Sequence, residues 1–188
     1  LSRSEDPAVR DMVPILVATL DRAVNLCRQT LSFSREGPRH LDISLFPLAD
    51  LVEEVATHLP EAQAEGRVVE TAFDRDLQLE ADRDELYRVF QNLLQNAFLA
   101  GAGRVVLSAA RQGADVSIDI ADDGSGLPPR ARANLFQPFA GSARKGGTGL
   151  GLAIARDLVR AHGGELALLQ SDEEGTVFRL RLKLSAMG

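Results

Sequence analysis

The sequence predicts an α+β fold, in which one or two bundle helices precede a two-layer sandwich with helices on one face of a sheet. Three observations support this prediction. Apolar residues near the N-terminus recur at the spacing of a helix bundle, and strand-like segments alternate with helical ones through the rest of the chain. The chain has 188 residues, of which 45% are hydrophobic, so it can bury a full core. That length somewhat exceeds one typical domain and is too short for two comfortable ones.

The first predicted element is one long helix over residues 6–35. Asp6 can cap its N-terminus, and Pro7 suits the first helical position, although Pro14 predicts a kink or a break in the first two turns. Such a wide apolar face must pack against other helices, either in a bundle or as an ordinary core helix of the main domain. The apolar positions, spaced alternately by four and three residues, are Val13, Val17, Leu20, Val24, Cys27 and Leu31.

The remaining elements follow in chain order. A second helix is predicted to begin at Phe46-Pro47, and a third, opened by a capping box of Asp82 and Glu85, runs to about Ala100. A last helix is predicted over 150–161, after a stretch rich in Gly and Pro. The predicted strands are Arg67–Phe73, Leu77–Ala81, Arg104–Arg111, Asp115–Ala121, Glu165–Gln170 and Val177–Leu184.

Composition excludes several classes of protein. Asp and Glu total 27 against 21 Lys and Arg, a formal net charge of −6, which argues against a general nucleic-acid binder. The sequence has no apolar run of about 18 residues and no signal-peptide pattern. The single cysteine excludes an internal disulfide framework and a cysteine-based zinc site.

The first candidate site is a pair of asparagines on the third predicted helix. Asn92 and Asn96 are four residues apart, so both amides project from one face while Leu93, Leu94 and Ala97 face inward. Two side-chain carbonyls placed in this way can hold a hard cation such as Mg²⁺. Taken alone, the pair favours two ordinary surface asparagines.

The second candidate site is the sequence DDGSGLP over residues 122–128, directly after a predicted strand. Its spaced glycines let the backbone approach a flat ligand, and the carboxylate of Asp122 can accept a hydrogen bond from an exocyclic amine. The alternative is a Gly-rich turn between two elements. The segment matches neither the dinucleotide-binding fingerprint nor the P-loop.

The third candidate site is the sequence GGTGLGL over residues 146–152, which leads directly into the last predicted helix. Small residues there leave the N–H groups of the helix start free to bind phosphate oxygens. Lys145, one of only two lysines in the chain, adjoins the motif and can neutralise phosphate charge.

In this order, the three motifs resemble the ATP-binding catalytic domain of sensor histidine kinases, in the GHKL superfamily. The helix with Asn92 and Asn96 resembles the N box, and Asp122-x-Gly124-x-Gly126 resembles the G1 box. Segments 135–139 (LFQPF) and 147–152 resemble the F and G2 boxes, and the AHGGE of 161–165 matches the helix end that follows them. The resemblance covers roughly residues 45–184, and it implies the Bergerat fold, a mixed sheet with helices on one face.

Carried over by position, the resemblance implies a role for each matching residue. Asn96 would ligate Mg²⁺, Asn92 would support the phosphate region, and Asp122 would bind the adenine amino group. Thr176 would place a hydroxyl near that aspartate. The other implied nucleotide-binding residues are Gly124, Gly126, Lys145, Gly147, Thr148, Gly149, Leu150, Gly151 and Leu152.

The resemblance also favours phosphoryl transfer to a side chain over hydrolysis. In the hydrolysing branches (gyrase, MutL and heat-shock chaperones), a glutamate four residues before the metal asparagine activates water. Asn92 stands at that position and cannot act as a general base. Leu99 and Ala100 replace the Lys and Tyr of many histidine kinases, and the 140–146 segment is short for an ATP lid. Both traits resemble the nitrogen-sensor-like subgroup, in which Lys145 would be the lid lysine.

The chain lacks a phosphoacceptor histidine of the expected type. His40, His58 and His162 have neither its motif nor its helical context, and each is interpreted as structural or solvent-facing. We therefore expect a fragment of a longer kinase. Residues 1–36 would be the second helix of a dimerisation hairpin, and residues 37–188 the catalytic ATP-binding domain.

The expected protein is the kinase core of a two-component system, a homodimer through a four-helix bundle. It would bind ATP and Mg²⁺ and transfer the γ-phosphate to a histidine outside this fragment, for relay to a response-regulator receiver domain. We expect a cytoplasmic fragment that contacts neither nucleic acid nor membrane, with any membrane anchor of the full-length protein outside this sequence. The alternatives are a degenerate kinase-like adaptor without turnover, disfavoured by the intact glycines, and a hydrolytic ATPase, disfavoured by Asn92.

Overall fold

The computed structural model describes residues 40–113, 115–139 and 149–183. The chain divides into two compact units, Leu1–Gly37 and Pro38–Gly188, and every described residue belongs to the second. The predicted first helix lies outside the described residues, so its packing and its role in dimerisation stay predictions.

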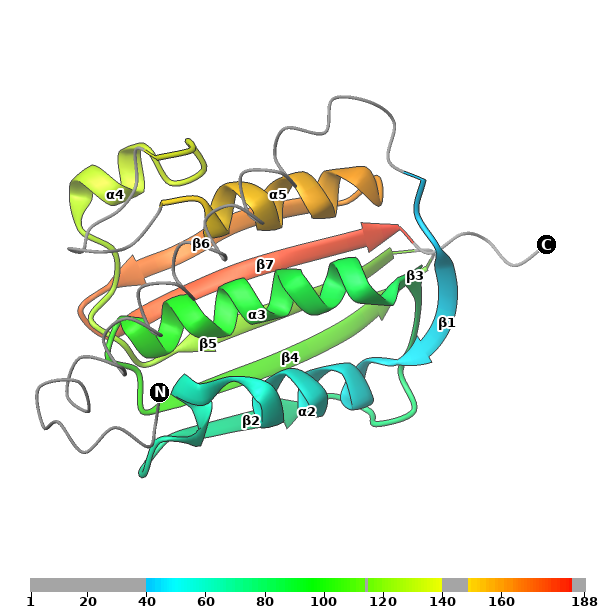
Figure 1. The fold of residues 1–188 in the computed structure, drawn as a ribbon, viewed down its shortest axis with the longest axis horizontal. Coiled ribbons are helices and arrows are strands. Elements are labelled where there is room, and N and C mark those ends of the chain that lie inside the picture. Colours follow the sequence, from blue (N-terminus) through cyan, green and yellow to red (C-terminus); the bar gives the residue numbers. More distant parts are fainter. Residues whose placement is uncertain (1–39, 114, 140–148, 184–188) are drawn as a thin grey trace, which may run out of the picture. The chain divides into compact units, whose positions relative to one another are not determined.

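The second unit is a two-layer α+β sandwich, which confirms the predicted fold class (Figure 1). The five-stranded sheet has the order β2-β4-β5-β7-β6, and the short strand β1 pairs with β3 separately. The pair β2–β4 is parallel and the other neighbours are antiparallel, so the sheet is mixed. The strands are β1 Ile43–Pro47, β2 Val68–Ala72, β3 Gln78–Asp82, β4 Arg104–Gln112, β5 Asp115–Asp122, β6 Glu165–Asp172 and β7 Gly175–Lys183.

Helices α2, α3 and α5 lie side by side over one face of the five-stranded sheet (Figure 1). The helical elements are α2 Leu48–His58, the 3-10 turn η1 Pro60–Gln63, α3 Arg83–Leu99, the short α4 Pro129–Ala133 and α5 Gly151–Ala161. Among the described residues, no helix combines the length and the apolar character needed to cross a membrane.

The core lies between these helices and the sheet. In α3 the fully buried residues recur every three or four positions, as expected of a helix with one face on a sheet, and Leu93, Leu94 and Ala97 are buried as predicted. Alternate residues of the central strands face them, among them Ile118 of β5 and Leu180 of β7. Each large side chain removed from water here contributes about 1.5–3 kcal/mol.

Two local predictions need correction. Phe46 and Pro47 end strand β1 rather than beginning a helix, and α2 begins at Leu48, because this segment pairs in register with β3. The capping box of α3 is only half formed: Asp82 Oδ1 accepts the Glu85 N–H at 3.1 Å, whereas the Glu85 carboxylate pairs with Arg88.

Candidate functional site

Asp122 is the last residue of β5 and stands directly opposite Thr176 of β7 in the antiparallel register. Its carboxylate accepts a hydrogen bond from the Gly124 N–H at 2.9 Å and another from the backbone of Thr176. Burial raises the pKa of the Asp122 carboxyl, and the nearby charge of Asp123 raises it further, although both hydrogen bonds act to lower it. The site therefore holds a half-buried carboxylate whose ionised form stays costly even with these two hydrogen bonds, so a further donor from a ligand would stabilise it.

The neighbouring carboxylate, Asp123, has a different task. Its Oδ1 accepts the N–H groups of Gly103 and Arg104 at 2.8 and 2.9 Å, which fixes the start of β4. Of the two adjacent aspartates predicted as one motif, one therefore faces the candidate site and the other anchors the sheet.

The loop after Asp123 is held closely against its surroundings. The Ser125 N–H and hydroxyl both donate to the carbonyl of Ala100, at the end of α3. Gly126 has φ +69°, and a Cβ placed there would lie 2.1 Å from the carbonyl oxygen of Asp172. This position requires glycine because the backbone conformation and the lack of space both exclude a side chain.

A buried pair of hydroxyls connects this loop to Thr176. Ser171 Oγ accepts the Leu127 N–H at 2.7 Å and lies 3.5 Å from Thr176 Oγ1. Both hydroxyl side chains are buried, and the Arg132 guanidinium donates to the Ser171 carbonyl. The sequence reasoning missed Ser171, because Leu127, whose N–H it accepts, lies 44 residues away in the chain and leaves no local pattern.

The two asparagines of α3 differ in their contacts. Asn92 Nδ2 donates to the Arg88 carbonyl at 2.9 Å, and its Oδ1 lies where a Cβ on Gly151 would come within 2.9 Å. Asn96 Nδ2 is buried without a hydrogen-bond partner among the described residues. A buried polar group left unpaired costs about 1–3 kcal/mol. The Asn96 Nδ2 donor is therefore suited to an acceptor that arrives with a ligand.

The start of α5 supplies backbone donors. Its N-cap residue is Leu150, whose side chain has no oxygen to accept the first-turn N–H groups. Gly149, Leu150, Gly151 and Leu152 are therefore placed at a helix start, as predicted. Lys145, Gly147 and Thr148 lie outside the described residues.

The segment resembling the F box packs on α5. Arg156 stacks on the ring of Phe136 with its guanidinium carbon 4.8 Å from the ring centroid, and it also donates to the Phe136 carbonyl at 3.1 Å. This contact holds the segment around Phe136 against α5.

The predicted site residues come from elements far apart in sequence, and the fold gathers them. Asn92 and Asn96 lie on α3, which packs against α5, and Asn92 meets Gly151 at the start of α5. Asp122 and Thr176 lie in register on neighbouring strands, and Gly124 would bring a Cβ within 3.0 Å of the Ala100 Cβ at the end of α3. The arrangement combines a half-buried carboxylate, a helix start and an unpaired amide.

This fold is that of a two-layer α+β domain with a cluster of polar groups at one end, and comparison with known proteins identifies its family. Residues 81–186 match the model of the histidine kinase-, DNA gyrase B- and HSP90-like ATPases. The chain belongs to this family, and its resemblance to sensor histidine kinases with a GHKL ATPase domain is confirmed by its curated relatives.

Two such relatives are the sensor histidine kinase GlrK of Escherichia coli and the sensory histidine kinase/phosphatase NtrB of Salmonella typhimurium. They are 35% and 31% identical to the chain over 95% and 86% of its length. The chain spans only 39% and 49% of the length of these relatives.

Solved structures show the same likeness. Full-length ShkA in complex with AMPPNP superposes with a TM-score of 0.82 at 28% identity, over 97% of this chain and 40% of that one. The histidine kinase ThkA in complex with the response regulator protein TrrA gives 0.74 at 25% identity, over 97% of this chain and 53% of that one.

Proposed function

We propose that this chain binds ATP with Mg²⁺ and contains the catalytic domain of a histidine kinase whose phosphoacceptor histidine lies outside the 188 residues. The observation that carries the proposal is the half-buried Asp122 carboxylate, whose burial its two backbone hydrogen bonds do not fully offset, so that a further donor such as the exocyclic amine of adenine would stabilise it. The AMPPNP bound to the related ShkA agrees with an ATP-like ligand.

The residues around the site fit the rest of such a ligand. The first turn of α5, whose N-cap residue Leu150 has no side-chain oxygen, suits the phosphates. Mg²⁺ is usually bound through few protein oxygens together with phosphates and water, so one amide oxygen, that of Asn96, is sufficient on the protein side. The metal would offset phosphate charge. Lys145, Gly147 and Thr148 stay proposed phosphate contacts.

The chemistry that this site favours is transfer to a side chain. The bond between the γ-phosphorus and the bridging oxygen breaks, a bond to a ring nitrogen of the acceptor histidine forms, and ADP leaves with the bridging oxygen. Asn92 has no basic group to activate water, and its amide already donates to Arg88. Catalysis would rest on positioning and charge neutralisation. The acceptor of the next step would be a receiver-domain aspartate, in line with the ThkA complex.

Several further features of the whole protein are also proposals. Residues 1–36 would form the second helix of a dimerisation hairpin, so that the intact protein is a homodimer, and residues 37–188 would form the catalytic domain. A cytoplasmic location follows from the same proposal.

Calorimetry with ATP and Mg²⁺ on the 188-residue chain tests the adenine assignment. Asp122→Asn keeps the size of the side chain but places an amide where an acceptor is needed, so we expect about 10- to 150-fold weaker binding, equivalent to the 1.5–3 kcal/mol of a hydrogen bond to a charged group. Asp123→Asn is the matched control: it removes the neighbouring charge and should leave the affinity within about threefold of wild type.

Equal binding by wild type and Asp122→Asn would refute the adenine assignment, and absence of binding by wild type would favour the adaptor alternative. Phosphate release separates kinase from hydrolase. Steady release of phosphate by this chain alone, without an acceptor histidine, would contradict the kinase proposal.

A further inference from the structure

Helices α3 and α5 are joined by a hydrogen bond at the end of the domain remote from the candidate site. His162 directly follows α5, and its Nε2 accepts the backbone N–H of Asp82, the N-cap of α3, at 3.0 Å. The other ring nitrogen, Nδ1, lies 2.8 Å from the Leu158 carbonyl. Because a carbonyl oxygen only accepts, Nδ1 carries the hydrogen, and the ring is held as one neutral tautomer by its two partners.

The His162 ring accepts an N–H group at the start of α3 that a carboxylate of the same helix accepts in a complete capping box. The Asp82 N–H is one of the donors that a helix N-terminus leaves unpaired, and in a capping box the Glu85 carboxylate would accept it. Here Glu85 pairs with Arg88 instead. The Asp82 carboxylate is also fully used: Oδ1 accepts the Glu85 N–H, and Oδ2 accepts the N–H of Asp42, just before β1, at 3.0 Å.

The two helices also pack against each other, and one of their contacts lies at the site itself. A Cβ on Gly151 would stand 2.9 Å from Asn92 Oδ1, so the start of α5 touches α3 without spare room. The helices run in opposite directions (Figure 1). Asp82 and Asn92 are ten residues apart, and Gly151 and His162 are eleven apart. At about 1.5 Å per residue, the two contacts are separated by roughly 15 Å along either helix.

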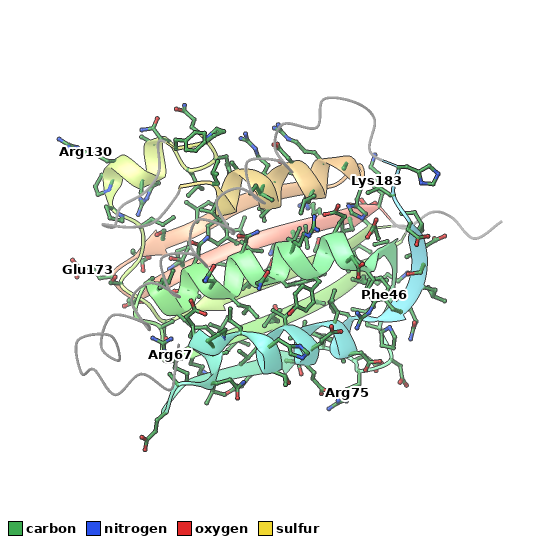
Figure 2. All side chains as sticks on the ribbon, viewed as in Figure 1. Phe46, Arg67, Arg75, Arg130, Glu173 and Lys183 are labelled. Atoms are coloured by element: carbon green, nitrogen blue, oxygen red, sulfur yellow. The ribbon has the colours of Figure 1, made fainter. Side chains whose placement is uncertain are left out.

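These two contacts lie toward opposite ends of the domain. In Figure 2, Phe46 and Lys183 mark the end with β1 and β3, where His162 meets Asp82, and Glu173, in the β6–β7 turn, marks the end with the candidate site. Two helices that are held at both of these contacts keep their relative tilt, whereas helices held at only one of them can rotate about that contact.

We propose that His162 is a positioning residue for the nucleotide site, acting through the hydrogen bond that fixes the end of α5 against the start of α3. This inference rests on the proposed function of the site as an ATP site. The bond sets where the first-turn N–H groups of α5 stand relative to Asn92 and Asn96. Its loss frees the His162 end of α5 and lets the helix tilt about the Gly151 contact, which changes the direction in which the first-turn N–H groups point and weakens nucleotide binding.

The chain provides a matched control in His58, the last residue of α2. Its Nδ1 lies 3.0 Å from the Glu54 carbonyl, the same contact one turn back that His162 makes with Leu158, and the residue is exposed. Among the described residues, His58 has no hydrogen bond to another helix or strand. The two histidines therefore differ in the bond across to a second element.

The test compares variants of the 188-residue chain. His162→Asn can keep the local bond to Leu158 but is too short to reach Asp82, whereas the amide oxygen of His162→Gln can replace Nε2 as the acceptor. We expect His162→Asn to weaken binding of ATP with Mg²⁺ roughly 3- to 10-fold by calorimetry. We expect His162→Gln to recover most of the wild-type affinity and His58→Asn to leave it unchanged.

A further variant separates positioning from general loss of stability. Val55 of α2 is fully buried, so Val55→Ala destabilises the domain without touching the junction of α3 and α5. With all variants measured where they are fully folded, Val55→Ala should bind ATP as wild type does. If His162→Asn binds ATP as tightly as wild type, or if Val55→Ala loses as much affinity, the inference is wrong while the proposed function stands.

NMR spectroscopy tests the geometry without nucleotide. Nitrogen-15 shifts of the His162 ring should show the tautomer with hydrogen on Nδ1, and the Gly151 amide resonance should move in His162→Asn but not in His58→Asn. If wild type binds no ATP, the proposed function fails, and these spectra still decide whether His162 sets the orientation of the Gly151 end of α5. An unchanged Gly151 resonance in His162→Asn would overturn the inference.

Discussion

Replacement of Gly126 by alanine should cost far more stability than the same change at a glycine with the same backbone conformation. Gly126 and Gly163 both have φ +69°, but a Cβ on Gly126 would lie 2.1 Å from the Asp172 carbonyl oxygen, while one on Gly163 has nothing within 4 Å. Both variants pay about 1–2 kcal/mol for a left-handed alanine. The difference between them therefore isolates the cost of the close approach.

The size of that difference follows from what has to move. The loop or the end of β6 must shift by about 1 Å, at the roughly 1–3 kcal/mol typical of an overpacked site. The shift also breaks the bond from the Leu127 N–H to Ser171 Oγ, worth about 0.5–1.5 kcal/mol. Gly126→Ala should therefore lose about 2–4 kcal/mol more than Gly163→Ala.

Urea unfolding followed by far-ultraviolet circular dichroism measures both variants. With a slope of about 2 kcal/mol per molar urea, the expected gap is about 1–2 M in the midpoint. The slopes themselves should match wild type if both variants keep the fold. Midpoints that fall together would refute the claim that Gly126 is needed for space as well as for its backbone conformation.

Three further outcomes can be checked. Because burial raises the pKa of the Asp122 carboxyl above its ordinary 3.8, the native domain holds that proton more tightly than the unfolded chain. Wild-type stability relative to Asp122→Asn should therefore fall as the pH rises from 3.8 through the raised pKa and then level off, measured by urea unfolding at a series of pH values. The affinity for ATP should change in the opposite sense and weaken as the pH falls through that pKa. A stability difference or an ATP affinity that stays constant over this pH range would contradict the burial argument. Ser171→Ala leaves the Leu127 N–H without its acceptor and should cost about 1–2 kcal/mol, with a severalfold loss of ATP affinity because the loop after Asp123 loosens; Ser171→Thr, which keeps the hydroxyl, serves as its control. Arg156→Met keeps an extended apolar side chain but loses the stacking and the bond to the Phe136 carbonyl, so it should cost about 1–2 kcal/mol and speed hydrogen exchange at the Gln137 N–H, whereas Arg160→Met on the exposed face of α5 should do neither.

Local sequence signals predicted the parts of the fold that local physics determines. Helix α3 carries its own cap in Asp82 and an apolar face of regular period, and both are present in the structure. Strands β2 and β3, by contrast, are neighbours in sequence joined by a short turn, yet they belong to different sheets. Strand β1 was missed because its partner lies more than 30 residues away and Phe46-Pro47 imitates a helix start.

The candidate site shows the same division. Asn92, Asp122 and the glycines were found because each belongs to a short motif. Ser171 and the bond between His162 and Asp82 were not found, because their partners are 44 and 80 residues away in the chain. Such contacts form only when the helices pack on the sheet, and no periodic pattern in the sequence predicts them.

The ladder of β5 against β7 has a consequence for insertions and deletions. Side chains alternate sides along a strand, so the number of residues between the turn at Gly113 and each carboxylate decides its side. This number is why Asp122 stands opposite Thr176 and Asp123 binds the start of β4. A single residue deleted within β5 would bring Asp123 into the register position opposite Thr176 and move the apolar side chains that follow the deletion to the opposite face of the sheet. Length changes that preserve the reading frame should therefore be tolerated in the turn between β4 and β5 but should disrupt the fold a few codons later.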